Sequence, residues 1–436
     1  MMVWDEMSQS DTEPQASSIP HSLFPIPEPL APDLGLYVHF PFCRSKCAYC
    51  DFASFPLEAA GGLPFARRYV EALAVEMDLR AATDEFRGSD LWSDSSQRDH
   101  LRGCPTRGRT HGVTTIFFGG GTPTALPAEW LAEVLRRIRL RFSVPDDAEV
   151  TVEANPGTVD REKLTTLREA GVNRLSLGVQ SFSDDTLALL GRLHTAAEAR
   201  EAISAARAAG FDNLSLDLIY GLPGQTVEEW REDVRAALEV APEHLSAYGL
   251  SLEPGTRLAA DVGCGRLPEP GEELYVGMYQ LAEEAFTAAG HEHYEISNYA
   301  RPGRECRHNR KYWSGDEYLG LGSSAHSHRR GVRWNNLPAP GVYCEWLERG
   351  RLPVERAEAR SARSRVGEML MLGLRCAEGV SEDEIAARTG LRPREVFGEA
   401  IARLSENGML YADDGRLRIP RGKWLVSNEA LAEFVS

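Results

Sequence analysis

Three of the eight cysteines in this 436-residue chain stand close together, as Cys43, Cys47 and Cys50. Their C-x3-C-x2-C spacing can bring three thiolates around one point. Three thiolates suit an iron–sulfur cluster better than zinc, whose structural sites take four ligands. A four-iron cluster needs one ligand for each iron, so three cysteines leave one iron open to bind another molecule. The spacing therefore predicts a 4Fe-4S cluster with one reactive iron.

Two other interpretations of these cysteines stay open at this point. A zinc site would need a fourth ligand, and Asp51 and His39 stand near enough in the sequence to supply it. A disulfide with a spare thiol is compatible with the spacing, although eight cysteines in 436 residues make no disulfide framework. The other cysteines are scattered and are expected to be buried or loop residues: Cys104, Cys264, Cys306, Cys344 and Cys376.

A glycine-rich segment and two polar side chains follow later apolar runs. Gly120 and Gly121, with Thr122 after them, let the backbone approach a ligand closely and leave polar backbone groups free to bind it. Glu153 and Gln180 each end a further apolar run. If these runs are parallel strands, the side chains meet at one edge of the sheet, where they favour a ligand site.

Asp217 and Arg192 add charge to the same region. Asp217 stands inside an otherwise apolar run, where a carboxylate needs a partner. Arg192 is a natural partner for a carboxylate, and the alternative is that it is a solvated charge on a helix. The alternative for Glu153, Gln180 and Asp217 is that they bind only the backbone or one another.

A second candidate site is the run from Cys306 to Trp313, which has the pattern H-N-x-x-Y-W after its cysteine. The neutral imidazole of His308 is a good axial ligand for heme iron, and Tyr312 and Trp313 can cover a flat macrocycle. Cys306 is a rival ligand because thiolates also bind heme iron. The alternative is that His308 is a hydrogen-bonded histidine and that the aromatic rings pack between domains.

These residues need a scaffold, and the chain alternates β-rich runs with amphipathic helices. The expected strands are 36–39, 114–118, 149–153, 174–179, 213–219 and 244–250, and the helices between them are 128–141, 161–170, 196–209 and 227–240. Such alternation predicts parallel strands with right-handed crossovers. The predicted fold class is α/β, an incomplete (βα)6 TIM-like barrel with its site at the strand C-terminal ends.

The rest of the chain divides around this barrel. A flexible leader is expected at 1–33, the barrel at 34–265 with a polar insertion at 84–112, and a barrel extension with the His308 loop at 266–359. Helices at 361–374, 381–389, 392–407 and 428–434 surround a hairpin at 409–419 and predict a small winged-helix-like domain at 360–436. Because the acidic and basic residues of 392–407 balance, this domain is interpreted as a lid or protein-contact domain.

Composition limits the function classes. The net charge of −17 argues against a nucleic-acid partner, since phosphate repels an acidic surface. No apolar run approaches the roughly 20 residues of a membrane span, and the first residues lack the basic start and apolar core of a secretory signal. An oxygen-sensitive cluster also fits a reducing cytoplasm, so a cytoplasmic protein is expected.

Taken together, these segments resemble the branch of the radical S-adenosylmethionine (SAM) superfamily that contains oxygen-independent coproporphyrinogen III oxidase and the heme chaperones called HemW. The resemblance runs from about Leu34 to Val435. The oxidases add a fourth cysteine two residues after the third, whereas Asp51 and Phe52 follow here, as in the chaperones. The H-N-x-x-Y-W run also resembles the heme-associated signature of the chaperones.

The resemblance implies a role for each candidate residue. Cys43, Cys47 and Cys50 would hold the cluster, and SAM would fill the open iron position. His308 would bind heme, the cargo. The positions expected to bind SAM or to lie beside it are Tyr37, Tyr49, Gly120, Gly121, Thr122, Glu153, Gln180, Arg192, Asp217, Ser251 and His326. Of these, His326 is equally well interpreted as a surface histidine.

The function that the resemblance implies is a heme chaperone that passes heme to acceptor proteins, such as respiratory hemoproteins. The cluster and SAM would act on its stability, dimerisation or heme release, and a homodimer is left open. The main alternative is an enzyme, an oxygen-independent coproporphyrinogen III oxidase that decarboxylates propionates through a SAM-derived radical. A different radical SAM enzyme with an unrelated small substrate is the third hypothesis.

Overall fold

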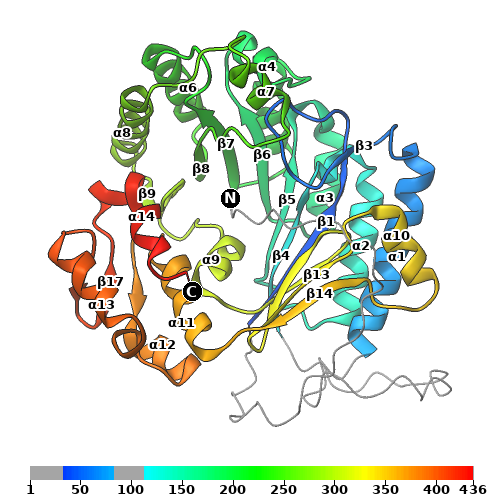
Figure 1. The fold of residues 1–436 in the computed structure, drawn as a ribbon. Helices are drawn as coiled ribbons and strands as arrows, with labels where there is room; N and C mark the ends of the chain where they lie inside the picture. Colours follow the sequence, from blue (N-terminus) through cyan, green and yellow to red (C-terminus); the bar gives the residue numbers. More distant parts are fainter. Residues whose placement is uncertain (1–32, 83–111, 436) are drawn as a thin grey trace. The chain divides into compact units, whose positions relative to one another are not determined.

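The computed structural model describes residues 33–82 and 112–435. The expected leader and the expected polar insertion therefore lie, apart from Asp33 and Gly112, outside the described residues. Six parallel strands are consecutive neighbours in one sheet (Figure 1). They are β1 (Leu34–Phe40), β4 (Val113–Gly120), β5 (Glu149–Ala154), β6 (Arg174–Gln180), β7 (Leu214–Tyr220) and β8 (His244–Gly249).

These strands confirm the predicted α/β fold, with each strand within one or two residues of its expected position. The expected crossover helices are present as α2 (Ala128–Arg141), α3 (Arg161–Glu169), α5 (Ala196–Ala208) and α6 (Val227–Glu239). The sequence did not predict α1 (Gly62–Ala82), the crossover between β1 and β4, or α4 (Asp184–Leu189). Short elements also line the strand ends: β2 (Phe42–Cys43), β3 (Phe55–Pro56), η3 (Pro123–Ala125) and η4 (Pro156–Thr158).

The starts of the crossover helices follow from their sequences. Thr195 and Thr226 cap α5 and α6, and each accepts a hydrogen bond from the backbone of the glutamate three residues later. In both helices that glutamate, Glu198 or Glu229, bonds back to the threonine backbone. This reciprocal capping satisfies two of the four N–H groups that a helix start leaves without partners.

Further strands extend the sheet on both sides to a total of twelve. Beside β1 the order continues with β11 (Tyr318–Leu321), which is parallel to β1, and then the antiparallel strands β12 (His326–Arg329), β13 (Val332–Asn336) and β14 (Val354–Ala359). Beside β8 it continues with β10 (Asn298–Ala300) and β9 (Glu292–Glu295). Among the described residues the end strands β14 and β9 do not pair, so the barrel is open.

Alternation along the strands separates an apolar outer face from a polar inner one. In β1, Leu36, Val38 and Phe40 are buried in the large apolar core with the crossover helices. Tyr37 and His39 point the other way, into the barrel, because successive side chains of a strand face opposite sides. The inner face is therefore where polar chemistry can be placed.

The C-terminal part of the chain has an apolar core of its own, built from residues between Val366 and Phe434. Its elements are α11 (Ala362–Gly373), β15 (Val380–Ser381), α12 (Glu382–Thr389), α13 (Pro393–Glu406), β16 (Tyr411–Asp413), β17 (Arg416–Arg418), η5 (Arg421–Val426) and α14 (Ser427–Ala432). The strands pair in the order β15-β17-β16. Helices around a small hairpin sheet agree with the predicted winged-helix-like fold.

The remaining helices connect these parts: α7 (Arg257–Gly263), α8 (Glu272–Ala288), α9 (Arg307–Ser314) and α10 (Pro340–Glu348). In Figure 1, α9 lies on the inner side of the curved sheet, whereas α1, α2 and α3 cover its outer side. No helix among the described residues is both long and apolar enough to cross a membrane.

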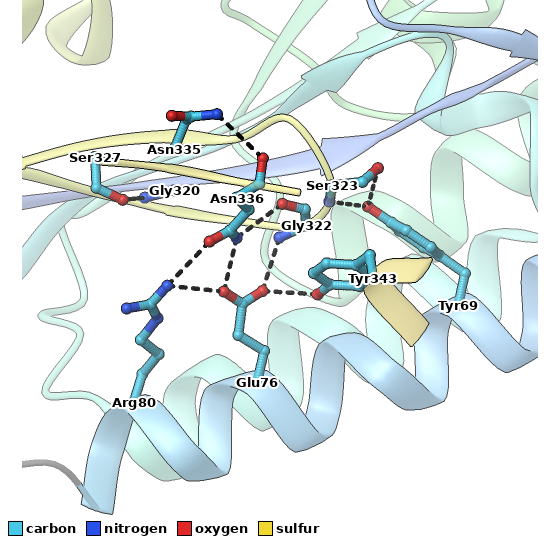
Figure 2. A network of polar contacts seen from close by, with 10 residues as sticks. All are labelled: Tyr69, Glu76, Arg80, Gly320, Gly322, Ser323, Ser327, Asn335, Asn336 and Tyr343. Carbon is cyan, nitrogen blue, oxygen red and sulfur yellow. Dashed lines mark hydrogen bonds and ion pairs between the residues drawn. The ribbon is translucent and has the colours of Figure 1, made fainter. Parts of the chain in front are cut away.

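A buried ion pair within α1 is the centre of a polar network that joins this helix to the strands that extend the sheet (Figure 2). The Glu76 carboxylate and the Arg80 guanidinium are 3.3 Å apart, with side-chain exposures of 0% and 1%. Glu76 also accepts hydrogen bonds from the Tyr343 hydroxyl at 2.7 Å, the Asn336 amide at 2.8 Å and the Gly322 backbone at 2.9 Å. One carboxylate thus ties α1 to α10, β13 and the turn after β11.

We predict that Glu76→Gln lowers the free energy of unfolding by about 3–5 kcal/mol, because it leaves Arg80 buried beside a neutral group. Urea unfolding followed by circular dichroism measures this loss. The control is Glu348→Gln on α10, which removes the exposed ion pair between Glu348 and Arg68 of α1 (2.6 Å). Its loss should lower the free energy of unfolding by less than about 1 kcal/mol. Equal losses in the two variants would contradict the assigned role of Glu76.

Candidate functional site

The three clustered cysteines follow β1 at the C-terminal edge of the sheet. Cys43 is buried, Cys47 and Cys50 are half-buried, and all three are free thiols, so the disulfide interpretation is wrong. Burial raises the pKa values of the Cys43 and Cys50 thiols. Two neighbouring groups donate hydrogen bonds to the sulfur atoms: the Thr122 hydroxyl to Cys43 at 3.7 Å and the Arg192 guanidinium to Cys47 at 3.4 Å. Such donors stabilise a thiolate.

Neither of the two residues that the sequence suggested as a fourth zinc ligand, His39 and Asp51, is placed to bind a metal together with the cysteines. The His39 ring is already engaged by the Ala53 carbonyl at 2.9 Å and by the Tyr37 hydroxyl at 3.1 Å. Asp51 is exposed. Among the described residues, no three His, Cys, Asp or Glu side chains are placed to hold a metal ion together. In an iron–sulfur cluster each thiolate binds its own iron, so its ligands need not converge on one atom.

A hydrogen-bonded chain of side chains connects the cysteine loop with the strand ends. Asn155, directly after β5, donates to the Thr122 hydroxyl at 2.8 Å and accepts from Arg192 at 2.5 Å. Arg192 also donates to the Gly178 carbonyl at 2.6 Å. Asn155 was not among the predicted site residues. Its place before Pro156, at the end of a predicted strand, was the available signal.

The glycine-rich segment brings the backbone of β4 directly against the cysteine loop. The amides of Gly121 and Thr122 donate to the Phe40 and Phe42 carbonyls at 2.8 and 2.7 Å. A Cβ on Gly121 would stand 2.6 Å from the Phe42 oxygen, and one on Gly120 would stand 2.5 Å from the His39 ring. Gly120 also has φ of +108°, a conformation that favours glycine.

Glu153 faces the inside of the barrel beside this segment. The Gly120 amide donates to its carboxylate at 3.3 Å. Burial, reinforced by the nearby charge of Asp217, raises the pKa of Glu153 to about 8. The side chain therefore holds a proton at neutral pH, and a cationic group that enters beside it would favour release of that proton.

Asp217 already has hydrogen-bond partners within the protein, whereas the side-chain oxygen of Gln180 has none among the described residues. Asp217 lies in the middle of β7 and accepts hydrogen bonds from Ser176 at 3.1 Å and Ser246 at 2.8 Å. This agrees with the alternative in which Asp217 binds its strand neighbours. Gln180, the last residue of β6, has φ of +68°, and its buried side-chain oxygen has no hydrogen-bond partner among the described residues.

The other predicted SAM residues are spread around the strand ends. Tyr37 is inside the barrel, with its ring 6.3 Å from that of Phe117. Tyr49 packs on a small apolar cluster that includes Ile219. Ser251 is exposed and donates to Glu253 at 2.7 Å. His326 is exposed on β12, as in the surface alternative.

His308 lies inside the barrel, where its ring stacks on those of Phe117 at 5.3 Å and Tyr37 at 6.5 Å. The predicted loop is a helix, α9, which begins after Cys306 and ends at Gly315 in a left-handed conformation. The imidazole is 1% exposed, and its two nitrogens contact the Thr115 hydroxyl at 2.8 Å and the Tyr312 hydroxyl at 2.9 Å. Burial lowers its pKa to about 3. Its role as an iron ligand stays a prediction, and ligation would require the ring to give up at least one of these contacts.

Known proteins show the same arrangement over nearly the whole chain. Residues 37–237 match the model of the Radical SAM superfamily, and residues 361–425 match the HemN C-terminal domain. The heme chaperone HemW of Mycobacterium tuberculosis is 36% identical over 383 residues, which cover 88% of this chain and 92% of that protein. HemW of Bacillus subtilis is 34% identical over 400 residues, which cover 92% of this chain and 98% of that protein. The chain belongs to the HemW family.

A solved structure supports the fold of this HemW-family chain. Coproporphyrinogen III oxidase (HemN) from Escherichia coli, a radical SAM enzyme, matches with a TM-score of 0.75 over 93% of this chain and 91% of that one. The identity is 24%, so this likeness shows a shared fold. The shared fold therefore includes both the barrel and the C-terminal part of the chain.

We predict that Gly120→Ala disrupts the site of this HemW-family chain, because a methyl group would collide with His39 while the backbone stays left-handed. The expected loss in unfolding free energy is roughly 2–4 kcal/mol, with less iron bound after anaerobic reconstitution. Gly210→Ala is the matched control, since Gly210 also has positive φ (+87°) but has no atom within 4 Å of a Cβ. It should cost about 1 kcal/mol and leave iron content unchanged.

We also predict a pH-dependent gain in stability for Glu153→Gln. In the unfolded chain the Glu153 carboxyl titrates near 4.5, and in the folded chain near 8. Between these values the folded state keeps a proton that the unfolded state loses, so the wild type is progressively destabilised as pH rises. Urea unfolding should therefore show the variant gaining about 1–3 kcal/mol over wild type between pH 5 and pH 8. A constant difference, like that expected for the exposed Glu58→Gln, would contradict the burial argument.

Proposed function

We propose that this chain is a heme chaperone, which binds heme and passes it to heme-accepting proteins such as respiratory hemoproteins. The observation that carries the proposal is the identity of 36% over 383 residues with a protein named heme chaperone HemW, 92% of whose length is matched. The same name applies to the relative in Bacillus subtilis, which is matched over 98% of its length. Heme is the cargo in this proposal, and the acceptor is a second protein.

We propose further that the cysteine loop holds a 4Fe-4S cluster and that SAM binds beside it. Three free thiols with two hydrogen-bond donors aimed at their sulfur atoms fit such a cluster. When bound, the cluster supplies an electron that can cleave SAM. Within the chain, Cys43, Cys47 and Cys50 would be the ligands.

The surrounding groups fit a zwitterionic ligand. Glu153 is a carboxyl inside the barrel that becomes negative when it loses its proton and can then pair with a positive charge, and it accepts a hydrogen bond from the Gly120 amide. Arg192 is a cation next to Cys47. The side-chain oxygen of Gln180 is buried without a partner among the described residues, so it is ready to accept from a ribose hydroxyl. Asp217 is the weaker ribose candidate, because two serines already occupy it.

The alternative function is an oxygen-independent coproporphyrinogen III oxidase. The fold shared with HemN of Escherichia coli keeps it under consideration, but a likeness at 24% identity extends to the fold alone. The residues after Cys50 are Asp51 and Phe52, so the additional cysteine expected of the oxidases is missing. The chaperone proposal is therefore the better supported one.

We predict that the anaerobically reconstituted protein binds ferric heme at one equivalent per chain, with a saturating Soret band. Mixed with a purified apo-cytochrome, the loaded protein should release heme at a rate that rises with acceptor concentration, because direct transfer requires contact between the two proteins. Stopped-flow absorbance measures this rate, with a heme-loaded serum albumin as the control for passive release. Absence of saturable heme binding, or consumption of coproporphyrinogen III with release of carbon dioxide, would overturn the proposal.

A further inference from the structure

A cavity of about 380 Å³ lies between α9, β9 and the C-terminal domain, far along the chain from the cysteine loop. A neighbouring cavity of about 480 Å³ shares Ala377, Glu378 and Arg421 with it. Both volumes are in the range of sites for small organic ligands. Because they share these wall residues, the two cavities are direct neighbours.

The two faces of α9 explain which residues reach this cavity. Residues three or four apart share a face of a helix, so His308 and Tyr312 lie on one side and Arg310 and Trp313 on the other. His308 and Tyr312 contact each other at the base of the barrel. Arg310 and Trp313 line the cavity instead. The H-N-x-x-Y-W segment therefore presents its tryptophan, not its histidine, to open space.

Trp313 is placed to stack on a flat ring. The Arg375 guanidinium lies 5.2 Å from the centre of the indole. Arg375 is not among the residues that line the cavity, whereas Trp313 is. The indole N–H is buried and has no hydrogen-bond partner among the described residues. A buried donor without a partner is unfavourable and marks a position where a ligand can supply one.

The cavity also contains a metal-binding side chain. Cys376 lies in its wall, held against β9 by the hydrogen bond from the Ala377 amide to the Tyr294 carbonyl at 2.9 Å. The one imidazole in the wall, His293, contacts Glu283 and the Ile296 carbonyl through its two nitrogens, at 3.1 Å each. Thiolate sulfur is an established axial ligand of heme iron. Burial and the nearby carboxylates of Glu295 and Glu378 raise the pKa of the Cys376 thiol to about 12, so iron has to displace its proton. No hydrogen bond to another described residue has to break for Cys376 to bind iron, in contrast to His293.

Charged groups of both signs border the same space: three arginines (Arg310, Arg416 and Arg421) and four glutamates (Glu292, Glu305, Glu378 and Glu384). The Arg421 guanidinium lines both cavities, lies 6.0 Å from the Trp424 ring and makes no hydrogen bond or ion pair with the described residues. Arg310 lines the first cavity and is paired with Glu378 at 2.8 Å. Arginine binds carboxylates through paired hydrogen bonds, which suits the propionates of heme.

We propose that heme is held in this cavity, with its ring against Trp313, its iron on the sulfur of Cys376 and a propionate at Arg421. On binding ferric iron, the Cys376 thiol releases its proton to solvent and the sulfur becomes the axial ligand. The inference rests on the proposed heme-chaperone function and adds the place and the ligand to it. It gives the segment after α11 a direct role in loading and release.

The test is ferric heme titration of the full-length protein, reconstituted anaerobically so that the cluster occupies Cys43, Cys47 and Cys50. Absorption and electron paramagnetic resonance spectra should show thiolate ligation in the wild type. Cys376→Ser should lose this signature and weaken heme binding at least tenfold. Cys264→Ser removes an exposed thiol and should leave both unchanged. Arg421→Gln, at an exposed position, should weaken binding several-fold without changing the ligand signature.

Three outcomes separate this inference from the function on which it rests. Wild-type spectra in folded Cys376→Ser, with thermal melting unchanged, would overturn the inference. Loss of ligation in His308→Ala, with Cys376→Ser unaffected, would also overturn it and would restore the histidine as ligand, leaving the chaperone function intact. Failure of the wild type to bind heme would overturn the proposed function itself.

Discussion

The site depends on the close contact between the backbones of the cysteine loop and of the glycine segment after β4. Two amides of that segment donate to carbonyls of residues 40 and 42, at 2.8 and 2.7 Å. Because a Cβ at Gly121 would lie 2.6 Å from one of those carbonyl oxygens, the contact exists only with glycine there. It sets the position of Cys43 relative to Thr122, and through Thr122 and Asn155 the position of Arg192. The polar groups at three strand ends are thus fixed by one backbone contact.

Helix α9 connects this barrel to the C-terminal domain, because one face of the helix contacts the barrel and the other contacts the C-terminal domain. Its barrel face is secured by Glu149, whose carboxylate accepts from the His308 amide at 3.0 Å and from the Arg307 amide at 3.1 Å. Its other face carries Arg310, which reaches Glu378 beyond α11. The Gly315 carbonyl at its end accepts from Arg388 of α12 at 2.5 Å. A short helix with contacts on both sides can therefore couple events in the barrel to the wall of the cavity lined by Trp313 and Cys376.

The sequence predicted what is local and repetitive, and missed what depends on distant partners. The six strands and four crossover helices follow from apolar periodicity, and the grouping of Cys43, Cys47 and Cys50 in one loop follows from their spacing. Helix α1 was missed although it is 21 residues long, because its apolar residues form only a weak stripe. The parallel pairing of β11 with β1 joins residues 283 positions apart, such as Gly35 and Tyr318, which no local pattern specifies. The burial of His308 has the same origin, since Thr115 and Glu149 lie on other strands.

The polar side chains buried inside the barrel lower the stability of the fold, and the same side chains can bind a ligand. Arg174 is 2% exposed and its Nε has no hydrogen-bond partner among the described residues, while burial raises the pKa of Glu153 to about 8. Buried polar groups without partners typically destabilise a fold by one to several kcal/mol, so a chain selected for stability alone would replace them with apolar residues. A zwitterionic ligand supplies a cation for the carboxyl and hydrogen-bond acceptors for unpaired donors. A ligand that pairs with these groups binds the folded barrel and not the unfolded chain, so ligand binding and folding of the barrel are thermodynamically linked.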